Sequence, residues 1–205
     1  MLPGEPGLNR DSAALVRAKA ALRQRLLAGR RELTDDQRAS AGRSLRDTVL
    51  SLPEIEMAGA VAAYCSVGTE PGTRGLLFAL WKRGTYVLLP LLLPDGDLDW
   101  ASYEGPESLA RGPRGLLQPT EPPRGPAAIA SADLVVVPAL AADRDGNRLG
   151  KGGGSYDRAL ARVGTPVPTV ALLYDGELLE QVPAGQDDVP VRLVAQPQGG
   201  ITRLR

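Results

Sequence analysis

A glycine-rich segment with one lysine is the part of the sequence whose residue types most directly suggest chemistry. It spans Asp143–Arg158 and reads DRDGNRLGKGGGSYDR. Its Lys151 is surrounded by four glycines, namely Gly150, Gly152, Gly153 and Gly154. Each glycine costs about 0.5–1 kcal/mol more than alanine to order, so we expect the backbone itself to be needed at this place.

The segment is suited to binding a phosphate. Glycines permit positive φ, so successive amide N–H groups can converge on an anion. A helix expected to begin near Ser155 would add its positive end. Arg148 and Lys151 supply mobile positive charge, and Asp157 could face a metal ion bound to the phosphate. The residues alone leave one alternative open, a flexible surface hairpin in which Ser155 only caps a helix.

Three common ligand-binding loops do not fit the segment. A Walker A loop needs four residues between its first glycine and its Gly-Lys pair, but only three separate Gly146 from Gly150. An EF-hand would place Arg148 where the loop needs glycine and Gly154 where it needs glutamate. The G-x-G-x-x-G spacing of dinucleotide-binding loops is also absent. The residues therefore do not identify the bound partner.

The composition excludes several kinds of catalysis. The 205 residues carry 24 basic and 24 acidic side chains and no histidine. Catalysis must therefore use carboxylates, lysine, arginine, backbone amides or a hard metal ion instead of a histidine base or ligand. The single cysteine, Cys65, can form neither an internal disulfide nor a zinc site. The balanced charge favours neither a nucleic-acid nor a membrane partner.

The sequence predicts a cytoplasmic, monomeric protein with one domain. No apolar run approaches the ~20 residues of a membrane-spanning helix. The first residues, MLPGEPGLNRD, lack the apolar core of a signal peptide. We expect residues 1–11 to be a disordered tail and residues 12–205 to form a single domain, because that length suffices for one core.

Hydrophobic periodicity predicts two leading helices. The first covers residues 12–28 and ends at Gly29, and the second covers 34–50 and begins with a capping box of Thr34 and Gln37. Strands are predicted at AGAVAAYC, TYVLLPLLL, DLDWASY, ADLVVVPAL, PTVALLY and, as the last, VRLVAQ. Two more helices are predicted at TRGLLFALWKRG and SYDRALARV, and residues 105–126 are predicted as loop.

This alternation predicts a three-layer α/β/α domain. Its sheet would be mostly parallel and Rossmann-like, similar to sugar-phosphate isomerase and CoA-transferase folds. Ligands of such sheets bind at the carboxyl ends of strands, where the glycine-rich segment follows DLVVVP. Lys19 and Arg23 share a face of the first helix and repel each other unless an anion lies between them. The residues alone fit an ordinary solvated helix face equally well.

The segment RLGKGGGSYDRAL after DLVVVPALAAD resembles the signature of the 5-formyltetrahydrofolate cyclo-ligase family, also called 5,10-methenyltetrahydrofolate synthetase. Other segments resemble the family in the same order, namely KAALR, YCSVGTEPGT, LDWASY, GLLQP and VPAGQDDVPV. Together they extend from residue 15 to residue 193. The joint match is therefore more specific than the loop alone.

The resemblance implies an ATP- and Mg²⁺-dependent enzyme of folate one-carbon metabolism. It would phosphorylate the formyl oxygen of 5-formyltetrahydrofolate, let N10 close the ring, and release ADP and phosphate with 5,10-methenyltetrahydrofolate. Such a reaction needs positioning and charge neutralisation more than a histidine. One alternative is a non-catalytic folate- or nucleotide-binding member of the same fold. Another, by fold analogy alone, is an unrelated α/β phosphate-binding protein.

The resemblance also implies the site residues. Lys151 and Tyr156 would be catalytic, and Asp157 and Asp188 would bind magnesium. ATP would contact Lys19, Arg23, Arg148, Leu149, Gly150, Lys151, Gly152, Gly153, Gly154, Ser155 and Tyr156. The folate would contact Arg23, Cys65, Glu70, Lys151, Gly152, Gly153, Gly154 and Ser155.

Two positions depart from the family pattern. Ser155 stands where many relatives have tyrosine, and Asp187 where many have histidine or asparagine. The adjacent Asp187 and Asp188 are expected either to bind the metal differently or to raise one carboxyl pKa. Four aromatic side chains are candidates for the wall of the folate pocket, namely Tyr64, Trp100, Tyr103 and Tyr156.

Overall fold

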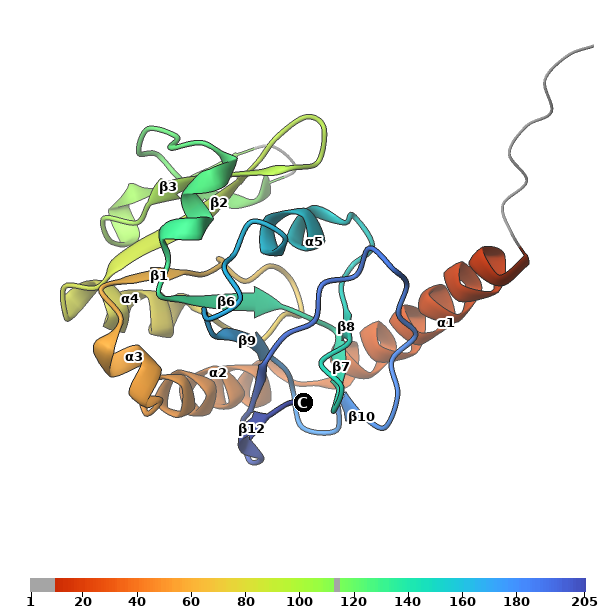
Figure 1. Cartoon of the computed structure of the whole chain (residues 1–205). Helices are drawn as coiled ribbons and strands as arrows, with labels where there is room; N and C mark the ends of the chain where they lie inside the picture. Colours follow the sequence, from red (N-terminus) through yellow and green to blue (C-terminus); the bar gives the residue numbers. More distant parts are fainter. Residues whose placement is uncertain (1–9, 113–114) are drawn as a thin grey trace, which may run out of the picture.

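The structure is a computed structural model that describes residues 10–112 and 115–205 (Figure 1). Its α-helices are α1 (Arg10–Glu32), α2 (Asp35–Leu50), α3 (Pro53–Met57), α4 (Arg74–Lys82) and α5 (Ser155–Leu160). The central sheet contains β1 (Ala60–Ala62), β2 (Tyr86–Leu92), β3 (Leu98–Ser102), β6 (Leu134–Pro138), β9 (Thr169–Leu172), β11 (Leu193–Gln196) and β12 (Gly200–Arg203). Smaller elements are η1 (Pro106–Ser108), β4 (Leu109–Arg111), β5 (Leu117–Pro119), η3 (Pro126–Ser131), β7 (Ala141–Asp143), β8 (Arg148–Leu149) and β10 (Leu178–Leu179).

The central sheet is mostly parallel, as predicted. Its strands lie in the order β12-β11-β9-β6-β1-β2-β3. The strands from β11 to β2 pair in parallel, and β12 and β3 pair antiparallel at the two edges. A parallel strand covered on both faces is apolar along its whole length, which explains the continuous runs LVVVP and TVAL.

Helices cover both faces of this sheet, which gives the predicted α/β/α arrangement (Figure 1). Alternate residues of each strand point to opposite faces. Val136 of β6 belongs to a core cluster with Leu45 of α2 and with side chains of α3 and α4. Its neighbour Val135 belongs to a second cluster with Leu160 of α5 and with η3. The central sheet therefore separates two hydrophobic layers.

The second helix begins as predicted. The Thr34 hydroxyl accepts a hydrogen bond from the Gln37 amide at 3.2 Å, and the Gln37 side chain accepts one from the Thr34 amide at 2.8 Å. Two of the unpaired N–H groups at the start of α2 are satisfied in this way. Ser51 is the C-terminal cap, so the predicted end is also correct.

The first helix is longer than predicted. It continues through Gly29 to Glu32, so the predicted end at Gly29 is wrong. A glycine inside a helix costs only about 1 kcal/mol relative to alanine, and the next residue, Arg30, is held by a buried ion pair with Glu177. Of the tail predicted for residues 1–11, residues 1–9 lie outside the described residues, and α1 already includes residue 10.

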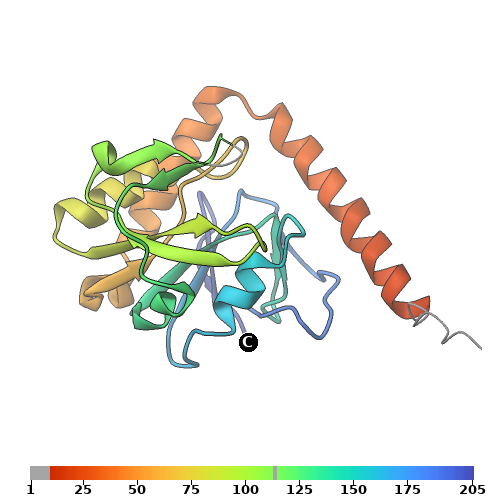
Figure 2. The same cartoon turned by 90° about the horizontal axis from the view of Figure 1, so that it is seen from above.

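Helix α1 reaches the rest of the protein through a small sheet. The strands of that sheet lie in the order β10-β7-β8. Leu22, Leu26 and Leu27 of α1 pack on its buried Leu140 and Leu149. Figure 2 shows α1 running along one side of the molecule, beside these strands. This packing fixes the position of the helix face that carries Lys19 and Arg23.

The shortest strands escaped sequence prediction. Residues 105–126, predicted as loop, contain η1 and the β4–β5 hairpin, and β12 follows the strand predicted to be the last. These strands lack the apolar runs that made equally short buried strands such as β1 and β9 recognisable. Among the residues that the structure describes, no helix is both long enough and apolar enough to span a membrane.

Candidate active site

A cavity of about 1020 Å³ opens where α1, α5, the β2–β3 hairpin and residues 150–154, here called the glycine loop, meet. It lies at the carboxyl ends of β1 and β6, where the fold class places ligand sites. Every residue assigned from the family resemblance lines it, namely Lys19, Arg23, Cys65, Glu70, Arg148, Leu149, Gly150, Lys151, Gly152, Gly153, Gly154, Ser155, Tyr156, Asp157 and Asp188. The fold therefore brings these residues together around one cavity.

The glycine loop connects β8 to α5 and needs its glycines for two reasons. Gly152 has φ +100° and Gly154 has φ +68°, which are backbone conformations that other residues rarely adopt. Gly152 also lies against α1, because a Cβ atom there would come within 3.3 Å of the Arg23 guanidinium carbon. The loop can therefore pass close beneath α1 before the predicted helix begins at Ser155.

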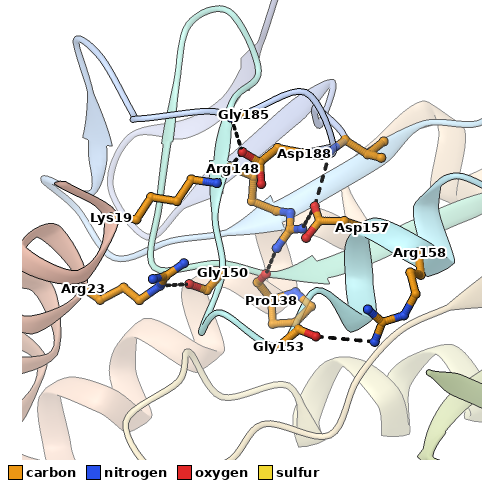
Figure 3. Close-up of polar contacts among 11 residues, drawn as sticks. Lys19, Arg23, Pro138, Arg148, Gly150, Gly153, Asp157, Arg158, Gly185 and Asp188 are labelled. Carbon is orange, nitrogen blue, oxygen red and sulfur yellow. Dashed lines mark hydrogen bonds and ion pairs between the residues drawn. The ribbon is translucent and has the colours of Figure 1, made fainter. Parts of the chain in front are cut away.

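Arg148 was predicted to supply a mobile positive charge, but its side chain is buried and ion-paired. Its side chain is only 3% exposed, and one NH2 group donates to Oδ1 of Asp157 at 2.6 Å (Figure 3). NH1 donates to the Pro138 carbonyl at 3.4 Å. The pairing of β8 with β7 places this side chain under the loop, so Arg148 is a fixed positive charge. The Lys151 side chain, by contrast, is 53% exposed.

Lys151 contacts the opposite wall of the cavity. Its Nζ lies 2.7 Å from Oε1 of Glu70, whose side chain is only 9% exposed. The second carboxylate oxygen of Glu70 accepts a hydrogen bond from the Val67 amide at 2.7 Å, which fixes its orientation. One ion pair therefore joins the glycine loop to the loop after β1, although these segments lie far apart in the sequence.

The cations of α1 face the cavity and have protein partners there. Lys19 forms an ion pair with Asp188, and Nε of Arg23 donates to the Gly150 carbonyl at 2.9 Å (Figure 3). These contacts compensate the repulsion expected between two cations four residues apart. They also tie α1 to the glycine loop and to the turn that contains Asp188.

Asp188 is held in its charged form. Burial acts to raise its pKa, but the hydrogen bonds from Lys19 and the Gly185 amide, with the charges of Lys19 and Arg148, hold the pKa below its usual value. The expected rise from the adjacent Asp187 is therefore wrong for Asp188. Asp187 is exposed to solvent, where its charge is screened.

The two predicted magnesium ligands are brought to the same part of the cavity. Asp157 lies on α5, and its Oδ1 accepts a hydrogen bond from the amide of Val189, the residue after Asp188, at 3.3 Å (Figure 3). No group of three or more His, Cys, Asp or Glu side chains forms a metal cluster in the parts of the chain that are described. Mg²⁺ is commonly held by one or two carboxylates together with substrate phosphates, so this donor set fits a phosphate-bound Mg²⁺.

Two tyrosines supply unused hydrogen-bonding groups. The hydroxyls of Tyr64 and Tyr156 are buried and have no partner among the described residues. Burial, assisted by the Glu70 carboxylate, raises the pKa of both phenols well above its usual value, so both remain protonated. A buried polar group without a partner is unfavourable, which suits these hydroxyls to binding a polar ligand.

The other aromatic candidates do not belong to the site. Trp100 is fully buried in a hydrophobic core cluster, and Tyr103 belongs to the cluster on the opposite face of the sheet. Neither is among the cavity-lining residues within the described chain, so their prediction as pocket walls is wrong. Cys65 is buried, as predicted, and burial raises the pKa of its thiol although Arg74 opposes the shift.

Sequence reasoning missed Arg30, which also lines the cavity. Its Nε and one NH2 group each donate to the Glu177 carboxylate at 2.7 Å, and the same NH2 group donates to the Ala139 carbonyl at 2.7 Å. Arg30 lies seven residues after Arg23 and therefore on the same helix face. This spacing could have identified Arg30 from the sequence, but a helix predicted to end at Gly29 does not include it.

The chain is similar to known proteins of one family. The model of the 5-formyltetrahydrofolate cyclo-ligase family matches residues 16–197. The chain is 38% identical to a 5-formyltetrahydrofolate cyclo-ligase of Mycolicibacterium smegmatis over 92% of this chain and 98% of that protein. It is 31% identical to the protein of that name from Escherichia coli, over 82% and 94%.

A solved structure gives the same result. The NMR structure of Aquifex aeolicus 5,10-methenyltetrahydrofolate synthetase matches with a TM-score of 0.79 and 29% identity, over 91% of this chain and 93% of that chain. The family match covers nearly the whole chain, including both walls of the cavity. The protein therefore belongs to the 5-formyltetrahydrofolate cyclo-ligase family.

Proposed function

We propose that the protein converts 5-formyltetrahydrofolate and ATP into 5,10-methenyltetrahydrofolate, ADP and phosphate, with Mg²⁺ as cofactor. The Lys151–Glu70 contact carries this proposal, because it joins a cationic loop to a buried carboxylate across one cavity. Single-ligand pockets typically occupy about 300–1,000 Å³. The volume of about 1020 Å³ gives room for two substrates side by side.

The cationic part of the cavity is proposed to hold the ATP phosphates. Lys19 and Arg23 of α1 line this part together with the glycine loop, whose backbone amides would supply further hydrogen-bond donors. Phosphoryl transfer depends mainly on positioning and charge stabilisation, for which fixed cations and amides are suited. The exposed Lys151 side chain would follow the γ-phosphoryl group as its charge redistributes, whereas the buried Arg148 would stay in place.

The reaction would proceed in two chemical steps. The formyl oxygen attacks the γ-phosphorus and ADP leaves, which makes the formyl carbon electrophilic. N10 then attacks that carbon and gives up its proton to the departing phosphate or to water, and the carbon–oxygen bond breaks with loss of inorganic phosphate. Bound Mg²⁺ would neutralise phosphate charge, and the residues that would hold it are Asp157 and Asp188. Tyr156, protonated because burial raises its pKa, would act as a hydrogen-bond donor rather than as a base.

The folate is proposed to occupy the part of the cavity lined by Glu70, Cys65 and Tyr64. A pterin ring has both donor and acceptor groups on its edge. Glu70 supplies an acceptor, and the unpartnered Tyr64 hydroxyl supplies a donor. The adjacent Leu92 and Leu98 of the β2–β3 hairpin offer apolar contact to the flat rings.

Product formation tests the proposal. The protein is mixed with ATP, Mg²⁺ and 5-formyltetrahydrofolate, and the near-ultraviolet absorbance of the methenyl product is followed. We expect absorbance to rise only when all three are present, with one ADP released per product. Folate binding without any rise in absorbance would contradict the proposal and would support a non-catalytic binding protein.

A further inference from the structure

The tip of the β2–β3 hairpin, residues 93–97, is fastened to α5 next to the glycine loop. The Ser155 hydroxyl donates to the Gly96 carbonyl at 2.5 Å, and NH2 of Arg158 donates to the same carbonyl at 2.6 Å. Arg158 also donates to the Gly153 carbonyl at 3.4 Å (Figure 3). Arg158 therefore bridges the glycine loop and the hairpin tip.

An ion pair reinforces these contacts outside the cavity. Arg162 follows α5. Its Nη1 donates to Oδ1 of Asp97 at 3.0 Å, and its Nη2 donates to Oδ2 of Asp97 at 2.6 Å. Nε of Arg158 lies 4.0 Å from the same carboxylate. The side chains of Asp97 and Arg162 are 14% and 33% exposed. A two-point arginine–carboxylate contact fixes orientation as well as distance.

Both fastened segments form walls of the cavity. Leu92 and Leu98, the residues on either side of the hairpin tip, line it from one side. The glycine loop, Ser155 and Arg158 line it from the other. Asp97 and Arg162 are not among the described lining residues, so they cannot act on a ligand by direct contact there.

We propose that Asp97 and Arg162 are positioning residues of a latch, formed with Gly96, Ser155 and Arg158, that holds the β2–β3 hairpin closed over the folate part of the cavity. The latch joins the hairpin to α5, next to the loop proposed to bind ATP phosphates. The short Ser155 side chain holds the Gly96 carbonyl close to α5. The proposal rests on the proposed function for its substrates.

The strength of the latch suits a reversible contact. Partly exposed ion pairs contribute little to stability, so the latch can open and close without unfolding the domain. Residues 93–97 extend beyond the last paired residues of β2 and β3, and Pro94 and Asp95 are exposed. Within the tip, the Leu93 amide donates to the Asp97 carbonyl and the Gly96 amide to the Leu93 carbonyl, both at 3.0 Å. These bonds shape the turn, and the latch contacts join it to α5.

A double-mutant cycle tests the latch. Asp97→Ala, Arg162→Ala and the double variant are compared for kcat and for the KM values of 5-formyltetrahydrofolate and ATP. Each single variant should raise the folate KM about two- to fivefold, the range expected for one such ion pair. The ATP KM and kcat should change less, and the double variant should resemble the single variants. The proposal would be overturned if the effects of the two single variants added up in the double variant. It would also be overturned if the KM values of 5-formyltetrahydrofolate and ATP rose equally.

A matched ion pair provides the control. Arg203 and Glu54 form a contact at 2.7 Å between β12 and α3, away from the cavity lining. The same alanine cycle there should leave the folate KM unchanged. A folate KM that rises equally in this control would show a general effect of lost surface charge and would overturn the latch.

Hydrogen exchange separates failure of the latch from failure of the proposed function. In the protein without substrates, exchange of the hydrogen-bonded tip amides of Leu93 and Gly96 should accelerate about two- to fivefold in Asp97→Ala and in Ser155→Ala, but not in Glu54→Ala. Unchanged exchange at the tip would overturn the latch even if the enzyme were active. Accelerated exchange with no methenyl formation by the wild type would leave the latch supported and overturn only the proposed reaction.

Discussion

Replacing Glu177 by glutamine should destabilise the protein by about 3–5 kcal/mol, because it removes one charge from a buried ion pair. The Arg30 and Glu177 side chains are 2% and 8% exposed. Glu177 also accepts a hydrogen bond from the Tyr174 amide at 2.8 Å. In the variant the Arg30 charge would remain buried, and the glutamine would offer one neutral acceptor in place of two charged oxygens, with its NH2 group facing other donors.

Urea unfolding and thermal unfolding measure this loss. For a protein of this length each kcal/mol lowers Tm by about 2–4 °C, so the expected fall is roughly 6–20 °C. Replacing both Arg30 and Glu177 by methionine should restore much of the stability, because no lone charge then remains buried. Since Arg30 anchors the helix that carries Lys19 and Arg23, Glu177→Gln should also raise the KM for ATP.

The control is the exposed pair of Glu54 and Arg203, whose side chains are 25% and 64% exposed. Glu54→Gln should cost less than about 1 kcal/mol. If Glu177→Gln were no more destabilising than this control, the buried pair would not anchor α1. A double methionine variant as unstable as the single variant would contradict the electrostatic explanation and indicate lost packing instead.

Three further predictions concern the cavity. Asp188→Asn should raise the Mg²⁺ concentration for half-maximal turnover about tenfold or more, and an unchanged requirement would remove Asp188 from the metal site. Because the folded pKa of Asp188 is lowered, its pair with Lys19 stabilises the fold above the unfolded pKa of about 3.9 and loses this effect as pH falls through the folded pKa. The stability difference between wild type and Asp188→Asn should therefore shrink in acid, and urea titrations showing a constant difference would refute it. Tyr64→Phe should raise the folate KM about two- to tenfold with the ATP KM unchanged, and a change confined to ATP would place Tyr64 at the wrong substrate.

Local signals predicted the elements whose stabilising contacts lie within a few residues. The capping box of Thr34 and Gln37 and the apolar run LVVVP are both contained in one element, and both predictions are correct. The end of α1 was wrong because its stabilising partner, Glu177, lies 147 residues from Arg30. Glycine propensity is a weak preference that such a buried contact overrides.

The site was predicted through the family resemblance, and its internal contacts were not. Chemical type alone suggested a mobile cation at Arg148, but strand pairing buried it against Asp157. The contact between Ser155 and the hairpin tip could not be predicted from the sequence. Gly96 takes part through its backbone carbonyl, a group that every residue has. Contacts made by backbone atoms, or between residues far apart in the chain, need the folded arrangement to be found.

Lys151→Ala tests the central claim most directly, namely that the glycine loop acts on the transferred phosphoryl group within the same cavity that binds folate. The measurement is the loss in kcat relative to the loss in folate affinity, with affinity taken from direct binding. We predict a fall in kcat of about 10²–10³-fold, as for removal of one electrostatic stabiliser of a transition state. Folate affinity should change by less than about threefold. A large loss of folate affinity with kcat preserved would contradict the account and assign Lys151 to substrate binding alone.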